Sequence, residues 1–168
     1  MAVIQKKICL LGDFAVGKTS LIRRFVEGRF EDQYLGTIGV RISRKTIARE
    51  NGSMNLLVWD MTGGEELNTH TRMSYLRGAA GALLVCDLTR RDTLTVFERY
   101  ARQLRVLNSQ TSLVFIGNKV DRADRNISDD ELFLICKALG NSKFFLTSAK
   151  TGSQVEEAFV YLAELIGK

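Results

Sequence analysis

The hydrophobic residues of this chain form two kinds of block that alternate from its first residues to its last. Blocks of one kind are short and rich in neighbouring apolar residues, which indicates strands. Blocks of the other kind carry an apolar residue at every third or fourth position, which indicates amphipathic helices. The strands predicted in this way are Met1–Gly12 (with Lys6–Gly12 as its buried part), Gly39–Ala48, Met54–Asp60, Gly81–Leu88, Leu113–Lys119 and Lys143–Ala149.

Four helices are predicted between or after these strands. The first runs from Gly17 to about Glu27, directly after the first strand. Another opens at Ser128, where Ser128 and Glu131 have the Ser-x-x-Glu spacing of a capping box, and runs through Leu139. Helical spacing of apolar residues marks the other two, with Leu94, Phe97, Ala101 and Leu104 in one and Val155, Phe159, Leu162 and Ile166 in the last.

The order of these elements predicts an α/β fold. Asn51-Gly52 between the second and third strands is a strong hairpin signal, so this pair is expected to be antiparallel. The other strands alternate with helices, which favours parallel pairing. We therefore expect a six-stranded, mostly parallel sheet with one antiparallel edge strand and helices on both faces. The 168 residues contain no repeat or linker, so residues 1–168 are expected to form a single domain.

Composition excludes several classes of protein. No apolar run approaches the ~20 residues that a membrane helix needs, and the first residues lack the pattern of a signal peptide. The net charge is +5, but lysines and arginines are scattered and aromatic residues are not interleaved with them. Nucleic-acid binding is therefore not expected.

Cysteine usage and the chain ends indicate a cytoplasmic protein. Cys9, Cys86 and Cys136 each lie in an apolar run without Cys-x-x-Cys spacing, as buried, reduced thiols would. No cysteine lies near the C-terminus, and Met1-Ala2 excludes N-myristoylation, so no lipidation site is visible. Peripheral membrane association would then need a longer tail or a partner.

A phosphate-binding loop is predicted where the first strand meets the first helix. The sequence there fits Gly-x-x-x-x-Gly-Lys-[Ser/Thr], in the strand–loop–helix context that this motif requires. Backbone N–H groups and the helix N-terminus would cradle the phosphates, while Lys18 reaches the outer phosphates and the Thr19 hydroxyl binds Mg²⁺. The predicted phosphate-binding residues are Gly12, Asp13, Phe14, Ala15, Val16, Gly17, Lys18, Thr19 and Ser20.

Two further motifs follow predicted strands. Asp60-Met61-Thr62-Gly63 offers a carboxylate for the Mg²⁺ shell and the Gly63 N–H for a terminal phosphate. Asn118-Lys119-Val120-Asp121 offers the Asp121 carboxylate to the N1–H and amine of guanine, which adenine does not present. The stem of Lys119 would lie along the base. After the last strand, a backbone N–H from Ser148, Ala149 or Lys150 could bind the guanine oxygen.

These motifs, in this order, resemble those of the Ras superfamily of small GTPases over essentially the whole chain. Tyr34–Val40, Leu56–Asp60, Tyr75–Ala79 and Leu84–Thr89 resemble the Rab branch in particular, although Arg41 stands where that branch usually carries an acidic residue. The resemblance implies a P-loop G domain that cycles between GTP and GDP with Mg²⁺. It also implies a monomer that meets effectors, exchange factors and activating proteins through two switch segments.

The same resemblance assigns further residues. Thr37 would bind Mg²⁺ and the γ-phosphate in the GTP form, which gives Thr19, Thr37 and Asp60 as metal ligands. Phe30 would pack against guanine, and Tyr34 would also contact the nucleotide. The second switch would run from about Gly63 to Arg77. The residues implied at the catalytic centre are Lys18, Thr37, Gly63 and Gly64.

The sequence departs from the family where hydrolysis occurs. The usual Asp-Thr-Ala-Gly-Gln-Glu of the second switch is here Asp60-Met61-Thr62-Gly63-Gly64-Glu65, so Gly64 replaces the glutamine that orients the attacking water. Phe14 and Ala15 replace small residues of the phosphate loop. Because phosphoryl transfer depends on positioning, we expect intrinsic hydrolysis to be slow while nucleotide binding is retained.

Several alternatives remain open at this point. Glu65, Glu66 or His70 could substitute for the missing glutamine, although His70 is more simply an exposed switch residue. Arg72 and Arg77 could act as arginine fingers, but structure or partner contact is the simpler role. The chain could also be a pseudo-GTPase scaffold that holds guanine nucleotide without significant hydrolysis. An ATP-dependent P-loop kinase is disfavoured by the guanine-specific motif.

Overall fold

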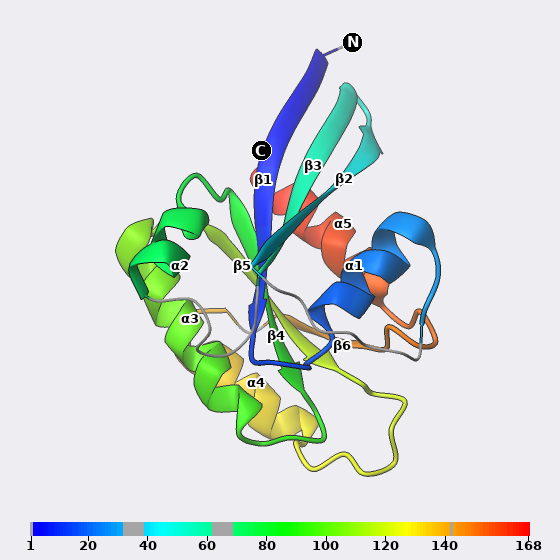
Figure 1. Ribbon diagram of the computed structural model, residues 1–168, viewed down its shortest axis with the longest axis vertical. Helices are drawn as coiled ribbons and strands as arrows, with labels where there is room; N and C mark the ends of the chain where they lie inside the picture. Colours follow the sequence, from blue (N-terminus) through cyan, green and yellow to red (C-terminus); the bar gives the residue numbers. More distant parts are fainter. Residues whose placement is uncertain (1, 32–38, 62–68, 142) are drawn as a thin grey trace.

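The computed structural model describes residues 2–31, 39–61, 69–141 and 143–168, which form one sheet surrounded by helices (Figure 1). The strands are β1 (Ala2–Gly12), β2 (Val40–Arg49), β3 (Gly52–Met61), β4 (Gly81–Asp87), β5 (Ser112–Asn118) and β6 (Phe144–Thr147). The helices are α1 (Lys18–Glu27), α2 (Thr69–Leu76), α3 (Thr93–Leu107), α4 (Asp129–Ala138) and α5 (Val155–Ile166).

The sheet has the strand order β2-β3-β1-β4-β5-β6, and only the β2–β3 pair is antiparallel. The hairpin pairs Arg49 with Gly52, so Glu50 and Asn51 form a two-residue turn. Gly52 has φ 139, a value that favours glycine, and a Cβ there would lie 2.1 Å from the Ala2 carbonyl oxygen. The predicted fold class, with one antiparallel edge strand, is confirmed.

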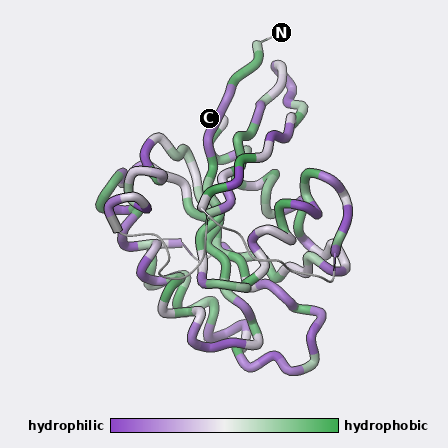
Figure 2. The backbone as a smooth tube through the Cα atoms, in the orientation of Figure 1, coloured by the Kyte–Doolittle hydropathy of each residue, from purple (hydrophilic) through white to green (hydrophobic). Residues whose placement is uncertain are grey.

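Two hydrophobic cores cover the two faces of the sheet. One face packs against α1 and α5, where the Phe25 and Phe159 rings stack with centroids 4.1 Å apart. The other face packs against α2, α3 and α4, with Phe97 on α3 against Phe115 on β5. Figure 2 shows the apolar character concentrated along the central strands. The central strand β4 is buried throughout, which explains its continuous apolar sequence.

Helix ends follow the signals in the sequence. Gly28 ends α1 in the left-handed conformation (φ 71) and donates its N–H to the Arg24 carbonyl. The Ser128 hydroxyl accepts the N–H of Glu131 at 3.1 Å, as the capping box predicts. Helix α4 ends at Ala138, one residue before the predicted Leu139.

Helix α2 and the first residues of β3 lie outside the elements that the sequence pattern predicted. The pattern predicted no helix at Thr69–Leu76, because few apolar residues recur there at helical spacing. Strand β1 begins at Ala2, as the predicted strand over Met1–Gly12 indicates, and its first residues are mostly exposed. Strand β3 begins at Gly52, two residues before the predicted Met54. In Figure 1 these strands extend together with β2 beyond the helices.

Candidate functional site

The predicted motif residues meet at one edge of the sheet, where the parallel strands end. Gly12 ends β1, Asp60 lies at the end of β3, and Asn118 ends β5. Thr147 ends β6, directly before Ser148. Parallel α/β sheets bind ligands beyond these carboxyl ends, so the fold brings the separate motifs into one site.

The phosphate loop wraps around the Lys18 side chain. Lys18 Nζ donates to the carbonyl oxygens of Gly12 (3.1 Å) and Asp13 (2.9 Å). Burial lowers the pKa of Lys18 to about 8, while the nearby carboxylates of Asp60 and Asp13 oppose part of this shift. A buried ammonium group with incomplete charge compensation favours an incoming anion, so this position suits phosphate.

Close backbone contacts hold the phosphate loop against the Asn118–Asp121 motif. Gly17 has φ 105, and a Cβ there would lie 2.3 Å from Asn118 Nδ2. Asn118 in turn donates to the Val16 carbonyl at 2.9 Å. Ala15 and Lys119 also have left-handed φ values, 58 and 68. Such φ values are uncommon for residues with a side chain and often occur at functional sites.

Thr19 and Asp60 provide the oxygen atoms expected of a magnesium site. The Thr19 hydroxyl donates to Asp60 Oδ2 at 2.5 Å, and Asp60 is buried. Hydroxyl and carboxylate oxygens suit Mg²⁺, which commonly takes one or two carboxylates together with phosphate oxygens. Within the described ranges no group of three or more His, Cys, Asp or Glu residues could hold a metal by itself. The donor set therefore fits an ion that is shared with a phosphate ligand.

A cavity of about 340 Å³ lies beside the phosphate loop and has the size of a small-ligand site. Phe30 and Lys119 provide apolar surface for a planar ring, and Asp121 provides a carboxylate. The cavity is lined by Ala15, Gly17, Ser20, Phe30, Glu31, Asn118, Lys119, Asp121, Arg122, Ala149 and Lys150.

Hydrogen bonds fix the polar groups around this cavity. Ser148 Oγ donates to Asp121 Oδ1 at 2.7 Å, and Thr147 Oγ1 donates to Asn118 Oδ1 at 2.9 Å. The N–H of Ser148 donates to the Ser153 carbonyl. A backbone N–H for a ligand must then come from Ala149 or Lys150 rather than from Ser148.

Two residues that the sequence analysis did not single out support these loops. Asp87, at the end of β4, is buried and pairs with Lys119 Nζ at 2.8 Å. Lys119 also donates to the Ala15 carbonyl at 2.9 Å, so it joins three loops. Arg24 on α1 donates to the carbonyls of Ala149 (2.8 Å) and Lys150 (2.6 Å). A carboxylate at a strand end was a usable signal for Asp87, whereas nothing local identified Arg24.

The described residues near the predicted γ-phosphate position and second switch include exposed side chains. Phe14 is 48% exposed, and its carbonyl accepts Arg90 Nη1 at 2.8 Å. His70 is exposed, as expected. Arg72 is buried with its guanidinium 5.4 Å from the centre of the Tyr100 ring, which favours a structural role.

Some predicted residues lie outside the described residues. These are Tyr34 and Thr37 of the first switch, and Gly63 and Gly64 of the second, together with Glu65 and Glu66. Their roles stay predictions. Cys9, Cys86 and Cys136 are buried free thiols, as the sequence indicated. No helix in the described part of the chain combines the length and apolar character needed to cross a membrane.

Comparison with known proteins agrees with the resemblance of the motifs. The family model that matches, over residues 7–168, is that of the Ras family. Ras-related protein Rab-18-B of Danio rerio is 38% identical over 163 residues, which cover 95% of this chain and 78% of that protein. Ras-related protein Rab-4A of Danio rerio is 41% identical over 163 residues, which cover 95% of this chain and 75% of that protein.

Proposed function

Because this chain belongs to the Ras family and is a Rab-like small GTPase, we propose that it is a guanine-nucleotide switch with slow intrinsic hydrolysis. The observation that carries the proposal is that the phosphate loop lines the same cavity as the Asp121 carboxylate, which accepts a hydrogen bond from Ser148. Residues 1–168 would act as one G domain and as a monomer.

Guanine would bind in the 340 Å³ cavity. Its N1–H and amine would donate to Asp121, which Ser148 already orients. Phe30 and the stem of Lys119 would pack against the base, and an N–H of Ala149 or Lys150 would meet the guanine oxygen. Adenine presents neither of the two donors, so the carboxylate would remain unpaired against it.

The phosphates would take over the hydrogen bonds that the loop now makes with itself. Lys18 would exchange the Gly12 and Asp13 carbonyls for phosphate oxygens. Thr19 and Asp60, with Thr37 in the GTP form, would hold Mg²⁺. When bound, the ion supplies positive charge that neutralises the outer phosphates.

Slow hydrolysis would follow from Gly64, which has no side chain to orient water. An exposed Phe14 beside the expected γ-phosphate position would also crowd any group that a partner supplies there. An activating protein would then have to provide the missing group in another way. Effectors and exchange factors would meet the chain through the switch segments, and any membrane association would be peripheral, through a partner or a longer tail.

The second candidate is a pseudo-GTPase scaffold, which Gly64 and Phe14 favour. The intact Lys18, Thr19 and Asp60 favour the switch instead, because a scaffold has no need for a site that senses the γ-phosphate. The two functions differ in exchange and hydrolysis. A switch releases GDP in minutes to hours and hydrolyses GTP measurably, whereas a scaffold does neither.

Nucleotide binding can be tested by following release of a fluorescent GDP from the purified protein. We expect unlabelled GDP to displace it and ATP to fail, and we expect EDTA to accelerate release because the ion links the phosphates to Thr19 and Asp60. Displacement by ATP, or release that EDTA leaves unchanged, would contradict the proposed site.

A further inference from the structure

Consecutive carbonyl groups of the phosphate loop each accept a hydrogen bond from a side chain. Lysines and an asparagine of the two sequence motifs bind four of these carbonyls, at 2.9–3.1 Å. The Phe14 carbonyl accepts from Arg90 Nη1 at 2.8 Å, and Arg90 belongs to neither motif. The acceptors are Gly12, Asp13, Phe14, Ala15 and Val16, and the donors are Lys18 for the first two, then Arg90, Lys119 and Asn118.

These contacts fix the direction of the N–H groups of the loop. In a trans peptide the C=O and the N–H point in opposite directions, so a donor that holds the Phe14 carbonyl also aims the Ala15 N–H. Among the residues that the structure describes, the N–H groups of Ala15, Val16 and Gly17 have no acceptor. Successive free N–H groups form a concave anion site. Arg90 therefore orients one wall of this site from outside it.

The loop needs such a contact at this point. Ala15 has φ 58, a left-handed value that is uncommon for a residue with a side chain. A strained backbone persists only where surrounding contacts hold it. The peptide that enters Ala15 is held by Arg90, and the peptide that leaves it is held by Lys119.

Arg90 is presented by an ordered turn between β4 and α3. Its N–H donates to the Asp87 carbonyl at 3.0 Å, and its carbonyl accepts from Thr93 Oγ1 at 2.7 Å. Thr89 donates its N–H and its hydroxyl to Asp87 Oδ1. Asp87 also pairs with Lys119 Nζ, so one buried residue supports the donors of two adjacent loop carbonyls. In Figure 1 the loops after β1, β4 and β5 lie at the same end of the sheet.

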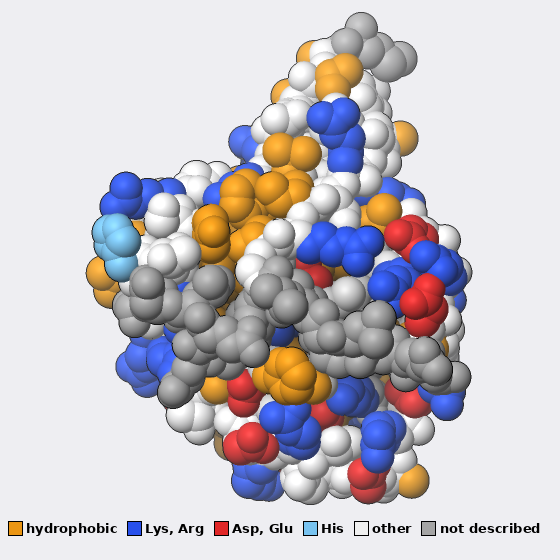
Figure 3. Space-filling model, in the orientation of Figure 1, with side chains coloured by type: hydrophobic (Ala, Val, Ile, Leu, Met, Phe, Trp, Pro, Cys, Tyr) orange, Lys and Arg blue, Asp and Glu red, His pale blue; other side chains and the backbone are white. Residues whose placement is uncertain are grey.

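Arg90 also offsets an acidic side chain of the phosphate loop. Arg90 Nη2 lies 3.8 Å from Asp13 Oδ2, and Asp13 Oδ1 accepts the Phe14 N–H at 2.7 Å. The same nitrogen lies 3.5 Å from Asp92, whose side chain is 70% exposed and more strongly screened by water. Without Arg90, the Asp13 carboxylate would repel an anion in the loop. Figure 3 shows acidic and basic side chains interleaved at this end of the molecule.

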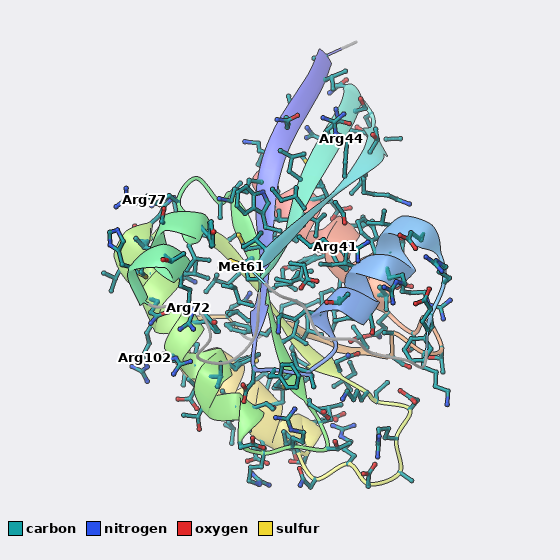
Figure 4. All side chains as sticks on the ribbon, viewed as in Figure 1. Arg41, Arg44, Met61, Arg72, Arg77 and Arg102 are labelled. Atoms are coloured by element: carbon teal, nitrogen blue, oxygen red, sulfur yellow. The ribbon has the colours of Figure 1, made fainter. Side chains whose placement is uncertain are left out.

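Other arginines do not reach this position. Arg91, the next residue, pairs with Glu131 and donates to the Asn126 carbonyl at 2.9 Å, so it ties the turn to the start of α4. Figure 4 shows Arg44 and Arg77 toward the opposite end of the molecule. Arg91 therefore serves as a matched control for Arg90.

We propose that Arg90 is a positioning residue for the phosphates. It holds the Phe14–Ala15 peptide so that the Ala15 N–H faces the bound anion, and it offsets the charge of Asp13. The inference rests on the proposed function, because it takes the anion to be the outer phosphates of a guanine nucleotide. Since Arg90 acts through the loop, it governs how tightly the phosphates are held and not how fast GTP is hydrolysed.

The first test is the rate at which a fluorescent GDP leaves the native protein and three variants. Loss of a charge-assisted hydrogen bond should make release from Arg90→Ala about fivefold to twentyfold faster. Arg90→Lys, which keeps the charge and one donor, should stay within about threefold of the native rate. Arg91→Ala should stay within about twofold, because its ion pair is largely exposed. Release from Arg90→Ala at the native rate would overturn the proposal.

Selectivity for the phosphates separates positioning from a general loss of stability. In titrations of the nucleotide-free proteins, Arg90→Ala should bind GDP more weakly but bind GMP, which lacks the outer phosphate, almost as the native protein does. Its preference for GDP over inosine diphosphate, which lacks the guanine amine, should be unchanged. Equal losses for GDP and GMP would show that Arg90 only stabilises the fold. Single-turnover hydrolysis at saturating GTP should change less than about twofold, and a fall of more than about tenfold would place Arg90 at the transition state instead.

Magnesium pyrophosphate separates this inference from the proposed function, because it carries phosphates without a base. Calorimetric titration should show that pyrophosphate binds Arg90→Ala at least about fivefold more weakly than it binds Arg91→Ala. If guanine nucleotides fail to bind the native protein while this difference persists, only the proposed function is overturned. If guanine nucleotides bind and Arg90→Ala matches Arg91→Ala with both GDP and pyrophosphate, only the role of Arg90 is overturned.

Discussion

The proposed guanine side and the proposed hydrolysis side of the site differ in which functional side chains the sequence retains. On the guanine side, Asn118, Lys119, Asp121 and Ser148 each make a hydrogen bond to a neighbouring loop. On the hydrolysis side, Gly64 replaces a side chain that would orient water, and Phe14 is 48% exposed. Under the proposed function, the protein keeps the groups that select guanine and lacks a side chain that would orient water for hydrolysis.

Under the proposed function, this difference separates binding from catalysis within one fold. Binding depends on groups that the closed sheet edge holds in position before any ligand arrives. Hydrolysis is expected to depend on a group that need only be in place at the transition state, so we expect its loss to leave binding intact. The predictions below test each side of this comparison.

The largest effect is expected from Asp121→Asn. The amide would present donors to guanine where the carboxylate accepts, and affinity for GDP should fall on the order of 10⁴-fold. The affinity for xanthosine diphosphate, which carries an oxygen in place of the guanine amine, should fall much less. Titration with fluorescent nucleotides measures both, with exposed Asp130→Asn as the control. Equal loss for the two nucleotides would show that Asp121 does not contact the base.

Asn118→Ala should weaken the connection of the phosphate loop to the loops that follow β5 and β6. It removes the bonds to the Val16 carbonyl and from the Thr147 hydroxyl, leaving buried polar groups without partners. The free energy of unfolding should fall by about 2–3 kcal/mol, with a further loss of GDP affinity. Urea denaturation of the nucleotide-free protein measures the first effect. Asn126→Ala, at an exposed position, should change stability by less than about 0.5 kcal/mol.

Phe14→Ser should have a smaller effect that depends on Gly64. The Arg90 contact is to the Phe14 backbone, so the loop should keep its conformation. Alone, the substitution should leave hydrolysis nearly unchanged, because no group is present to orient water. In a Gly64→Gln background it should raise the rate by about threefold to tenfold over Gly64→Gln alone. An equal increase without Gly64→Gln would mean that Phe14 itself limits hydrolysis.

The smallest effect is expected at the buried thiols of Cys9 on β1, Cys86 on β4 and Cys136 on α4. Burial raises the pKa of Cys9 and of Cys136 to about 12, and it raises the pKa of Cys86 as well. Since the thiolate is the reactive form, a disulfide reagent at pH 8 should modify none of the three in the native protein. All three should react in denaturant. Rapid reaction of any one would show that the fold opens locally around that cysteine.

Much of the fold could be predicted because its signals are local. Buried strands such as Gly81–Asp87 are continuous apolar runs, and Ser128–Glu131 carries its own capping pattern. Helix α2 was not predicted, because few apolar residues recur in Thr69–Leu76 at helical spacing; the Lys7 side chain that donates to the Tyr75 carbonyl lies 68 residues away in the chain. The start of β3 was missed because Gly52 and Ser53 are not apolar and so add nothing to the hydrophobic pattern.

The motifs of the candidate site could be read from sequence, but the contacts that connect them could not. Gly12–Thr19 and Asn118–Asp121 have fixed spacings that the chemistry of their ligands requires. The pairing of Lys119 with Asp87, and of Arg24 with the carbonyls after Ser148, joins residues far apart in the chain. Such partners depend on the folded path, so no local pattern identifies them.

We propose that this protein retains guanine-nucleotide binding and lacks only the group that orients water for hydrolysis. The most direct test is single-turnover hydrolysis of Mg²⁺·GTP by the native protein and by Gly64→Gln, after nucleotide extraction shows equal loading. We predict faint turnover in the native protein and an increase of at least about tenfold in the variant, because the amide can orient water. Brisk turnover in the native protein, unchanged by Gly64→Gln, would contradict the claim.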